Sequence, residues 1–374
     1  MKTDLLIIAG EASADQHGAA LIRELKQLRP ELSLWGIAGD ALEAQGAELI
    51  IHQREMAFLG IGEVLRHLPL IRRVRRAILN RIDAQKPTAA LLIDYPGFNL
   101  KLARDLKKRG VPVIYYISPQ LWAWGKKRVE KIRRYVDLML VLFPFEQKFY
   151  RQHGIIAHYV GHPLVDYHQP YLPREFKTVT PGAAVLGLLP GSRVNEVRAL
   201  LPRMAQTARL LKERGAIKKA EIIRAAQIDE SLYRTILPDQ TDWLSLVQKP
   251  LYRALPEYDA AMVASGTATL ETALYAVPML IVYHVHALTY WLGKRLVKIP
   301  NIGLANIVAE TPIAKEMIQH EFQPPAAAAY LEQILQPEQN RQIREKSLII
   351  REKLGKPGAS RRAAEIIDRF LPAS

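Results

Sequence analysis

Two turns in the second half of the chain have the composition of anion-binding sites. The first is the Pro-Gly-Ser-Arg sequence 190–193, which follows the apolar run 185–189 and precedes a helix opening with Asn195 and Glu196. A strand that ends in such a turn leaves backbone N–H groups unpaired at the start of the next helix, where an anion can bind. Arg193 adds a cation suited to phosphate oxygens.

The second turn has the sequence Ala-Ser-Gly-Thr-Ala-Thr-Leu-Glu over residues 264–271. Two such turns in one half of a chain predict a diphosphate held between them, and therefore a nucleotide-linked substrate. Ser265 or Thr267 is expected to cap the following helix. Glu271, one turn further, could accept both ribose hydroxyls or simply be a favourable charge in the first turn of a helix. The residues assigned to this nucleotide site are Gly191, Ser192, Arg193, Ser265, Gly266, Thr267 and Glu271.

A carboxylate in the first half is the candidate general base. Asp94 closes the apolar run 90–93 and precedes a Tyr-Pro-Gly turn. A carboxylate at the carboxyl end of a buried strand is partly desolvated, which raises its pKa toward a value useful for accepting a proton. The alternative is a structural aspartate that caps the Pro-Gly turn.

Polar and aromatic side chains for a sugar acceptor are also present in the first half. The turn at 9–18 contains Gly10 but lacks a G-x-G-x-x-G pattern, and its acidic residues are unsuited to a pyrophosphate. It suits sugar hydroxyls, or Ser13 is the N-cap of the next helix. The segment 118–124 carries two tryptophans before a basic run, which indicates an aromatic shelf with a cationic rim. The residues assigned to the acceptor side are Glu11, Ser13, Asp15, Ser118, Trp122 and Trp124.

The segment 68–82 is basic and amphipathic. Apolar residues fall on one helical stripe, and five arginines occupy the other faces within ten residues. Such a helix is typical of a membrane surface, or of a docked helix with a solvated charged side. Because the arginines exceed what solubility requires, we favour contact with anionic headgroups, and 290–298 is a similar basic-aromatic segment. The residues assigned to the membrane are Leu68, Ile71, Arg72, Arg73, Val74, Arg75, Arg76 and Ile78.

Composition limits the function classes. The 374 residues carry a net charge of +15, which favours an anionic partner, and contain no cysteine, which excludes disulfides, thiolate zinc sites and a catalytic thiol. The histidines have no metal-ligand spacing and no D-x-D cluster follows a predicted strand, so we expect neither metal nor cofactor. We find no signal peptide and no apolar run of the ~18–20 residues that a spanning helix needs. A soluble or peripheral cytoplasmic protein is expected.

Apolar runs alternate with amphipathic helical patterns such as 19–28 and 100–109, which predicts an α/β protein with parallel sheets covered on both faces. We expect two Rossmann-like doubly wound domains, at 1–165 and 184–339, with a cleft between them. A proline-rich linker at 166–183 and a basic helical segment at 340–374 complete the chain. The predicted strands are 5–9, 32–38, 89–94, 113–117, 138–143, 157–160, 185–189, 221–225, 244–247, 260–263 and 279–283.

Together these motifs resemble the lipid-A-disaccharide synthase family, bacterial glycosyltransferases of lipopolysaccharide assembly. The resemblance covers nearly the whole chain and rests on residues 9–15, 59–65, 93–99, 118–124, 142–146, 160–164, 189–193 and 264–271. It implies a metal-independent glycosyltransferase-B fold with Asp94 as catalytic residue, Arg193 on the diphosphate and Asn306 in the nucleotide site. Ala14 and the segment 309–312 depart from the family pattern.

The implied reaction joins UDP-2,3-diacylglucosamine to 2,3-diacylglucosamine 1-phosphate, with inversion, to give a β-1,6-linked disaccharide 1-phosphate and UDP. It implies acylated partners and a place on the cytoplasmic face of the inner membrane. A UDP-sugar epimerase of the same fold remains an alternative, and so does a basic nucleic-acid-binding protein, although no nucleic-acid-binding module is recognisable and we expect no nucleic-acid partner. The oligomeric state is left open.

Overall fold

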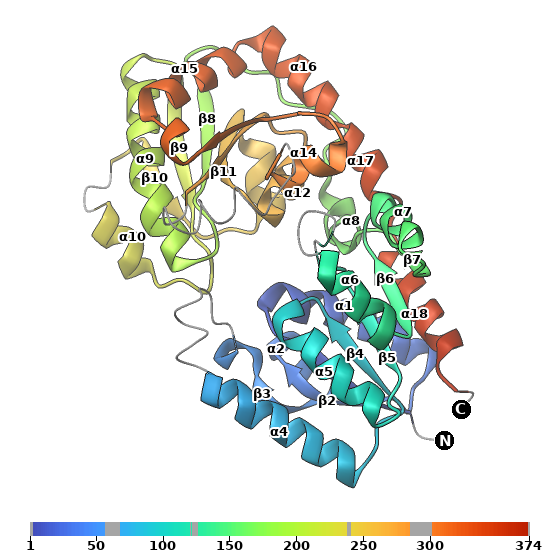
Figure 1. Cartoon of the computed structure of the whole chain (residues 1–374). Coiled ribbons are helices and arrows are strands. Elements are labelled where there is room, and N and C mark those ends of the chain that lie inside the picture. The colour runs from blue at the N-terminus through green and yellow to red at the C-terminus, as the bar shows by residue number, and fades with distance from the viewer. Residues whose placement is uncertain are drawn as a thin grey trace. The chain divides into compact units, whose positions relative to one another are not determined.

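The computed structural model describes residues 3–56, 68–119, 121, 126–237, 241–284 and 301–372. The chain divides into two units (Figure 1), the first formed by Met1–Asp166 with Lys356–Ser374 and the second by Tyr167–Gly355. This division differs from the expected domains in two respects. The expected linker 166–183 belongs almost entirely to the second unit, and the expected C-terminal segment 340–374 is shared, with its last part returning to the first unit.

The first unit is built on a seven-stranded parallel sheet in the order β3-β2-β1-β4-β5-β6-β7. Apart from Asp4 at the start of β1, its central strands are formed by buried apolar and aromatic residues, as expected of parallel strands covered on both faces. The strands are β1 (Asp4–Ala9), β2 (Ser33–Ala38), β3 (Ala47–His52), β4 (Ala89–Ile93), β5 (Val113–Tyr116), β6 (Leu138–Val141) and β7 (Ala157–Tyr159).

The helices of the first unit connect and cover these strands. Pro96 and Pro144 stand in the first turns of α5 and α7, where a missing N–H leaves no hydrogen bond unmade. The helices are α1 (Ala12–Leu28), α2 (Asp40–Glu43), α4 (Leu68–Ala84), α5 (Pro96–Lys108), α6 (Lys126–Tyr135), α7 (Pro144–Gln152) and α18 (Ala359–Phe370), with a 3₁₀ turn at Gln53–Glu55. A further helix, α8 (Pro163–His168), begins in the first unit and ends in the second.

The last helix, α18, packs against α1 and is fixed at both ends. At its start, the Asp166 carboxylate accepts from the backbone N–H groups of residues 358–360 at 2.5–3.2 Å. At its end, the buried Arg29 guanidinium donates to the carboxylate of Asp368 at 2.6 Å and to the backbone oxygen of Pro372 at 2.8 Å. The first unit is therefore completed by a segment from the far end of the chain.

The second unit has a six-stranded parallel sheet in the order β10-β9-β8-β11-β12-β13. Leu186, Leu188, Met262 and Leu280 lie in its core. The strands are β8 (Ala184–Leu189), β9 (Ile217–Ile223), β10 (Leu244–Val247), β11 (Ala260–Ala264), β12 (Met279–Tyr283) and β13 (Lys315–Ile318).

Eight helices accompany this sheet in the part of the second unit that the structure describes: α9 (Val194–Glu213), α10 (Glu230–Ile236), α11 (Leu251–Ala254), α12 (Thr267–Leu274), α14 (Leu304–Ala309), α15 (Pro324–Ile334), α16 (Pro337–Ser347) and α17 (Ile349–Leu354). Short 3₁₀ turns lie at Gln169–Tyr171, Leu255–Glu257 and Gln319–Glu321. Both units are thus Rossmann-like, and the predicted α/β class with two parallel sheets is confirmed.

Each strand order reverses direction at one point, between β1 and β4 in the first sheet and between β8 and β11 in the second. In open α/β sheets, the loops that leave the carboxyl ends of the two strands at such a point diverge and form a ligand crevice. The residues after β1 and β4, and those after β8 and β11, are therefore the places where the fold can hold a site.

Candidate active site

Asp94 follows β4 at the reversal point of the first sheet, next to the turn that follows β1. The register pairs Ala9 with Ile93, so Gly10 and Glu11 lie beside Asp94 and Tyr95. Gly10 is required here because a Cβ at this position would lie 2.5 Å from the ring of Tyr95. The fold therefore brings two predicted site residues, Glu11 and Asp94, to one end of the sheet.

The backbone at Asp94 has an unusual conformation. Asp94 and Tyr95 both have φ of 46°, in the left-handed region that non-glycine residues rarely adopt and that costs roughly 1–3 kcal/mol per residue. The Asn99 side chain donates to the backbone oxygens of Ile93 and Asp94 at 3.2 and 2.7 Å, and the Tyr115 hydroxyl donates to that of Asp94 at 2.6 Å. These bonds hold the backbone of the strained turn in place.

The electrostatic environment makes Asp94 a weak acid. Burial is the main cause that raises the pKa of Asp94 to about 7, and the neighbouring Glu11 carboxylate adds to the effect, while the Tyr95 backbone N–H opposes it. A carboxylate with a pKa near the working pH can both take and release a proton, which is the property required of a general base.

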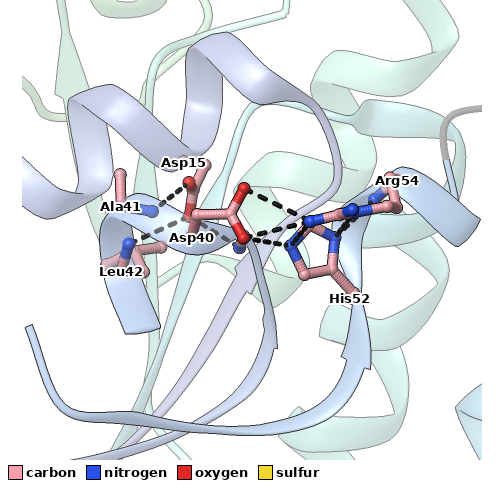
Figure 2. Close-up of polar contacts among 7 residues, drawn as sticks. Asp15, Asp40, Ala41, Leu42, His52 and Arg54 are labelled. Carbon is pink, nitrogen blue, oxygen red and sulfur yellow. Dashed lines mark hydrogen bonds and ion pairs between the residues drawn. The ribbon is translucent and has the colours of Figure 1, made fainter. Parts of the chain in front are cut away.

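The structure gives Asp15 a structural part, as Figure 2 shows. Its carboxylate accepts from the backbone N–H groups of Gly39, Ala41 and Leu42 at 2.7, 2.9 and 3.2 Å, and so anchors the start of α2. Asp40 in the same helix pairs with His52 and Arg54 (Figure 2). Both oxygens of Asp15 are thus used inside the protein, which accounts for this residue without a sugar contact.

The remaining acceptor-side residues fall into three groups. The N-cap of α1 is Glu11, so the alternative that Ser13 caps this helix is wrong, and Ser13 is exposed in the first turn. Ser118 is buried and its hydroxyl lies 2.8 Å from that of Tyr150, which indicates a structural part. Trp122 and Trp124, like the motif at 59–65 and the segment 290–298, lie outside the described residues.

The turn after β8 has the predicted donors, and they hold a carboxylate of the chain itself. The Ser192 backbone N–H donates to Glu196 Oε2 at 3.2 Å, and Arg193 Nη1 pairs with Glu196 Oε1 at 3.1 Å. Gly191 has φ of 109°, and a Cβ there would clash with Oε2 of Glu196. Half of the Arg193 side chain is exposed. Glu196 thus occupies the donors that we assigned to a phosphate. The sequence did not indicate this role for Glu196.

The turn after β11 lies beside the turn after β8, because the register pairs Leu189 with Val263. The expected cap is corrected here: the N-cap of α12 is Gly266, without a side-chain hydrogen bond, because the Ser265 hydroxyl donates to the backbone oxygen of Ile302 at 3.0 Å and Thr267 is the first helical residue. The backbone N–H groups at this helix start are therefore not used by a side-chain cap. The fold brings both predicted anion-binding turns together at one reversal point.

Glu271 lies one turn into α12, as predicted, and 18% of its side chain is exposed. Its Oε1 is 3.1 Å from Nε2 of His168, a buried residue that the sequence did not single out. Tyr275, one turn further along, contacts the other nitrogen of the same imidazole.

Asn306 has no free hydrogen-bonding capacity. Its amide group donates to the backbone oxygen of Ala314 and to Glu316, and its oxygen accepts from the backbone N–H groups of Ile313 and Ala314, all at 2.8–3.0 Å. With 1% of its surface exposed, it holds the loop before β13 in place. The direct nucleotide contact implied by the family resemblance therefore does not fit this conformation. Glu316, which also accepts from the backbone N–H groups of Ile302 and Gly303, is a second structural residue that the sequence did not indicate.

The membrane prediction for α4 is corrected in part. Val74, Ile78 and Ile82 lie in the core of the first unit, and Ile71 packs against that core, so the apolar stripe covers the sheet and is not available to a bilayer. Arg75 is paired with Asp105 at 2.5 Å. Leu68 is partly buried, and Arg72, Arg73 and Arg76 are exposed. The docked-helix alternative accounts for the apolar residues, while three cations remain on the outer face.

Among the described residues, no helix is long and apolar enough to cross a membrane. The same residues contain no group of three His, Cys, Asp or Glu side chains arranged to hold a metal ion.

Comparison with solved structures establishes the fold. The structure of Staphylococcus aureus MnaA with UDP matches with a TM-score of 0.67 at 12% identity, over 99% of this chain and 97% of that one. The calicheamicin glycosyltransferase CalG4 matches with a TM-score of 0.60 at 16% identity, over 99% and 98%. The predicted glycosyltransferase-B fold is thereby confirmed. A structure titled UDP-N-acetylglucosamine 2-epimerase also matches, with a TM-score of 0.60 at 12% identity over 100% of this chain and 98% of that one, so the fold does not decide the reaction.

Comparison of sequences identifies the family. The family model described as lipid-A-disaccharide synthetase matches residues 5–370. A lipid-A-disaccharide synthase of Syntrophus aciditrophicus (strain SB) is 42% identical over 366 residues, 96% of each chain, and that of Geobacter sulfurreducens is 40% identical over 372 residues, 98% of this chain and 97% of the relative. These matches span both units, and the chain therefore belongs to the lipid-A-disaccharide synthetase family, whose members are glycosyltransferases.

Proposed function

We propose that this protein is an inverting, metal-independent glycosyltransferase that joins UDP-2,3-diacylglucosamine to 2,3-diacylglucosamine 1-phosphate. The products are the β-1,6-linked disaccharide 1-phosphate and UDP. The observation that carries the proposal is Asp94, a carboxylate with a pKa of about 7 at the reversal point of the first sheet. Family membership supports the substrate class, because the relatives are named for synthesis of the lipid A disaccharide.

Asp94 is proposed to activate the acceptor. Converting an α-linked donor into a β-linked product requires one in-line displacement, in which the acceptor 6-oxygen bonds to the anomeric carbon as the bond to the UDP oxygen breaks. The hydroxyl proton passes to the Asp94 carboxylate. Because its pKa is about 7, a large fraction of Asp94 is ionised at neutral pH and still basic enough to accept this proton.

The two turns of the second sheet are proposed to bind the diphosphate and to stabilise the leaving group. UDP gains negative charge as the glycosidic bond breaks. The uncapped N-terminus of α12 supplies donors for it, and Arg193 and the Ser192 N–H group do so when the diphosphate displaces the Glu196 carboxylate that holds them. These groups do what a metal ion does in other glycosyltransferases. We therefore expect catalysis without added divalent cations.

Contact with an anionic membrane is proposed to occur through charge. The helices α4 and α5, which are joined by the Arg75–Asp105 and Arg109–Asp83 ion pairs, carry six exposed cations in addition to Lys107, which pairs with Asp137. Each cation near an anionic surface contributes about 1 kcal/mol of attraction. This attraction would hold the protein at the cytoplasmic face of the inner membrane, where acylated substrates reside. The cations are Arg72, Arg73, Arg76, Lys101, Arg104 and Lys108.

The decisive experiment measures UDP release from UDP-2,3-diacylglucosamine with and without the acylated glucosamine 1-phosphate acceptor. We expect release only with the acceptor, a disaccharide with a β-anomeric NMR coupling, and an unchanged rate in EDTA. Recovery of an epimerised UDP-sugar, or turnover of donor alone, would refute the transferase assignment. Loss of activity in EDTA with recovery in Mg²⁺ would refute metal independence.

A further inference from the structure

A buried histidine connects Glu271 of α12 with Tyr275, the C-cap residue of the same helix, in the second unit. His168, at the end of α8, is 0% exposed. Its Nδ1 lies 3.0 Å from the hydroxyl of Tyr275, and its Nε2 lies 3.1 Å from Oε1 of Glu271. Two hydrogen bonds fix the ring of this fully buried imidazole between a phenol and a carboxylate. The ring therefore restrains the side chains of both Tyr275 and Glu271.

The partners assign the direction of both hydrogen bonds. A carboxylate oxygen accepts, so we assign the ring proton of His168 to Nε2, which then donates to Glu271. In the neutral imidazole Nδ1 is then an acceptor, and the Tyr275 hydroxyl donates to it. Tyr275 stays protonated because burial and the charge of Glu271 raise its pKa well above the ordinary value. The chain of donors runs from Tyr275 through His168 to Glu271.

This arrangement leaves the two oxygens of Glu271 in different situations. Oε1 is held by His168, whereas Oε2 has no hydrogen-bond partner in the described part of the chain, and the side chain is partly exposed. The carboxylate also stands one turn into the helix that starts after Gly266, and the turn before that helix lies next to the turn after β8. The position of the carboxylate is fixed through Oε1, and Oε2 remains available as an acceptor. Such a group is suited to accept hydrogen bonds from a vicinal diol.

We propose that His168 is a positioning residue that aims Glu271 at the ribose diol of the bound nucleoside diphosphate, and so makes the site select ribose over 2′-deoxyribose. The inference rests on the proposed function, because it requires a nucleoside diphosphate in the paired turns. It adds a residue outside the recognised motifs, and it assigns the specificity to the hydrogen bond between His168 and Glu271. Without that bond, Glu271 is free to adopt other rotamers, and the diol loses its fixed acceptor.

The test compares affinities for UDP and 2′-deoxy-UDP by isothermal titration calorimetry on the full chain. A hydrogen bond to a charged acceptor corresponds to roughly a 10- to 100-fold preference for UDP in the unsubstituted protein. His168→Phe, which keeps an aromatic ring of similar size, is expected to reduce this preference to less than about threefold while the affinity for 2′-deoxy-UDP stays unchanged. The unchanged affinity distinguishes a positioning role from general damage to the fold.

Two further variants make the outcome decisive. Glu271→Gln should lose the same preference, and the double variant His168→Phe/Glu271→Gln should lose no more than either single one, because both act on one interaction. Tyr275→Phe should retain most of it, since Nε2 can still donate to Glu271. If Glu271→Gln abolishes the preference while His168→Phe retains it, the positioning role is refuted and the nucleotide site stands. If the unsubstituted protein binds neither nucleotide, the proposed function itself fails, and the inference with it.

Discussion

Replacing Asp94 by Asn should lower turnover and, at neutral pH, stabilise the first unit. Asn retains the left-handed backbone conformation at this position and cannot accept the acceptor's proton, so turnover is expected to fall about 10²-fold or more. UDP affinity should stay nearly unchanged, because the anion-binding turns belong to the second unit. Near-normal turnover of Asp94→Asn would remove Asp94 from its role.

The stability effect follows from the pKa. The folded protein raises the pKa of Asp94 from its ordinary value of 3.8 to about 7. Because its pKa is raised in the folded state, Asp94 does not lower the free energy of unfolding below about pH 4. As the pH rises toward 7, Asp94 lowers this free energy progressively, because the folded state must then hold a buried charge. A difference of about three between these pKa values corresponds to about 4 kcal/mol. Asp94→Asn removes this cost, so its gain over the unsubstituted protein should grow from near zero at pH 4 to a plateau of about 3–4 kcal/mol above pH 7.

Hydrogen exchange at the amides of β4 measures this gain for the first unit alone, even if the two units unfold separately. Asp242→Asn, which removes an exposed carboxylate of the second unit, is the matched control and should show no pH-dependent gain. A difference between Asp94→Asn and the unsubstituted protein that stays flat from pH 4 to pH 8 would refute the assignment of a raised pKa to Asp94.

Four other outcomes test the remaining parts of the site. Glu11→Gln should move the rising limb of the pH profile of kcat/KM to lower pH, because removing the neighbouring charge lowers the pKa of Asp94; an unmoved limb contradicts this. Arg193→Ala should weaken UDP binding and kcat/KM together by about 1.5–3 kcal/mol, and an effect on only one of them argues against contact with the diphosphate. Glu196→Gln should tighten UDP binding, since the charge that competes for Ser192 and Arg193 is removed; weaker binding would mean that Glu196 mainly orders the turn. Replacing Arg72, Arg73 and Arg76 of α4 by Gln should lower the affinity for anionic vesicles. High salt should lower the affinity of the unsubstituted protein in the same way, because salt screens the attraction. The control variant, with Gln at Arg209, Lys218 and Arg369, should keep its affinity.

All central strands could be predicted from the sequence, whereas two of the four edge strands could not. Every predicted strand is present within a few residues of its expected ends, because the central strands of a parallel sheet are continuous apolar runs. The two missed strands, β3 and β13, are both at sheet edges, where one side faces solvent and polar residues interrupt the pattern. The order of the strands then determines which strand ends meet at the two reversal points.

The site could be predicted where a backbone turn or strand end determines it. Asp94 and the turns at 190–193 and 264–267 lie at strand ends, and strand ends are visible in sequence. The structural roles of Asp15, Asn306 and Glu196 could not be predicted, because each role depends on hydrogen bonds to groups whose distance is set only by tertiary packing. The prediction that the apolar stripe of α4 contacts a membrane was wrong for a related reason. An amphipathic pattern indicates that one face of a helix is buried, and it does not indicate whether protein or lipid covers that face.

The return of α18 to the first unit has a consequence for how the protein is made. Arg29 and its partner Asp368 are separated by 339 residues. At a synthesis rate of roughly 5–20 residues per second, the ribosome needs about 17–70 s to produce the second after the first. Throughout that interval the α1 surface that α18 will cover is open, and the guanidinium of Arg29 lacks the oxygens that later surround it. The unit translated first is therefore the one that finishes folding last, after the ribosome has delivered the whole of its neighbour.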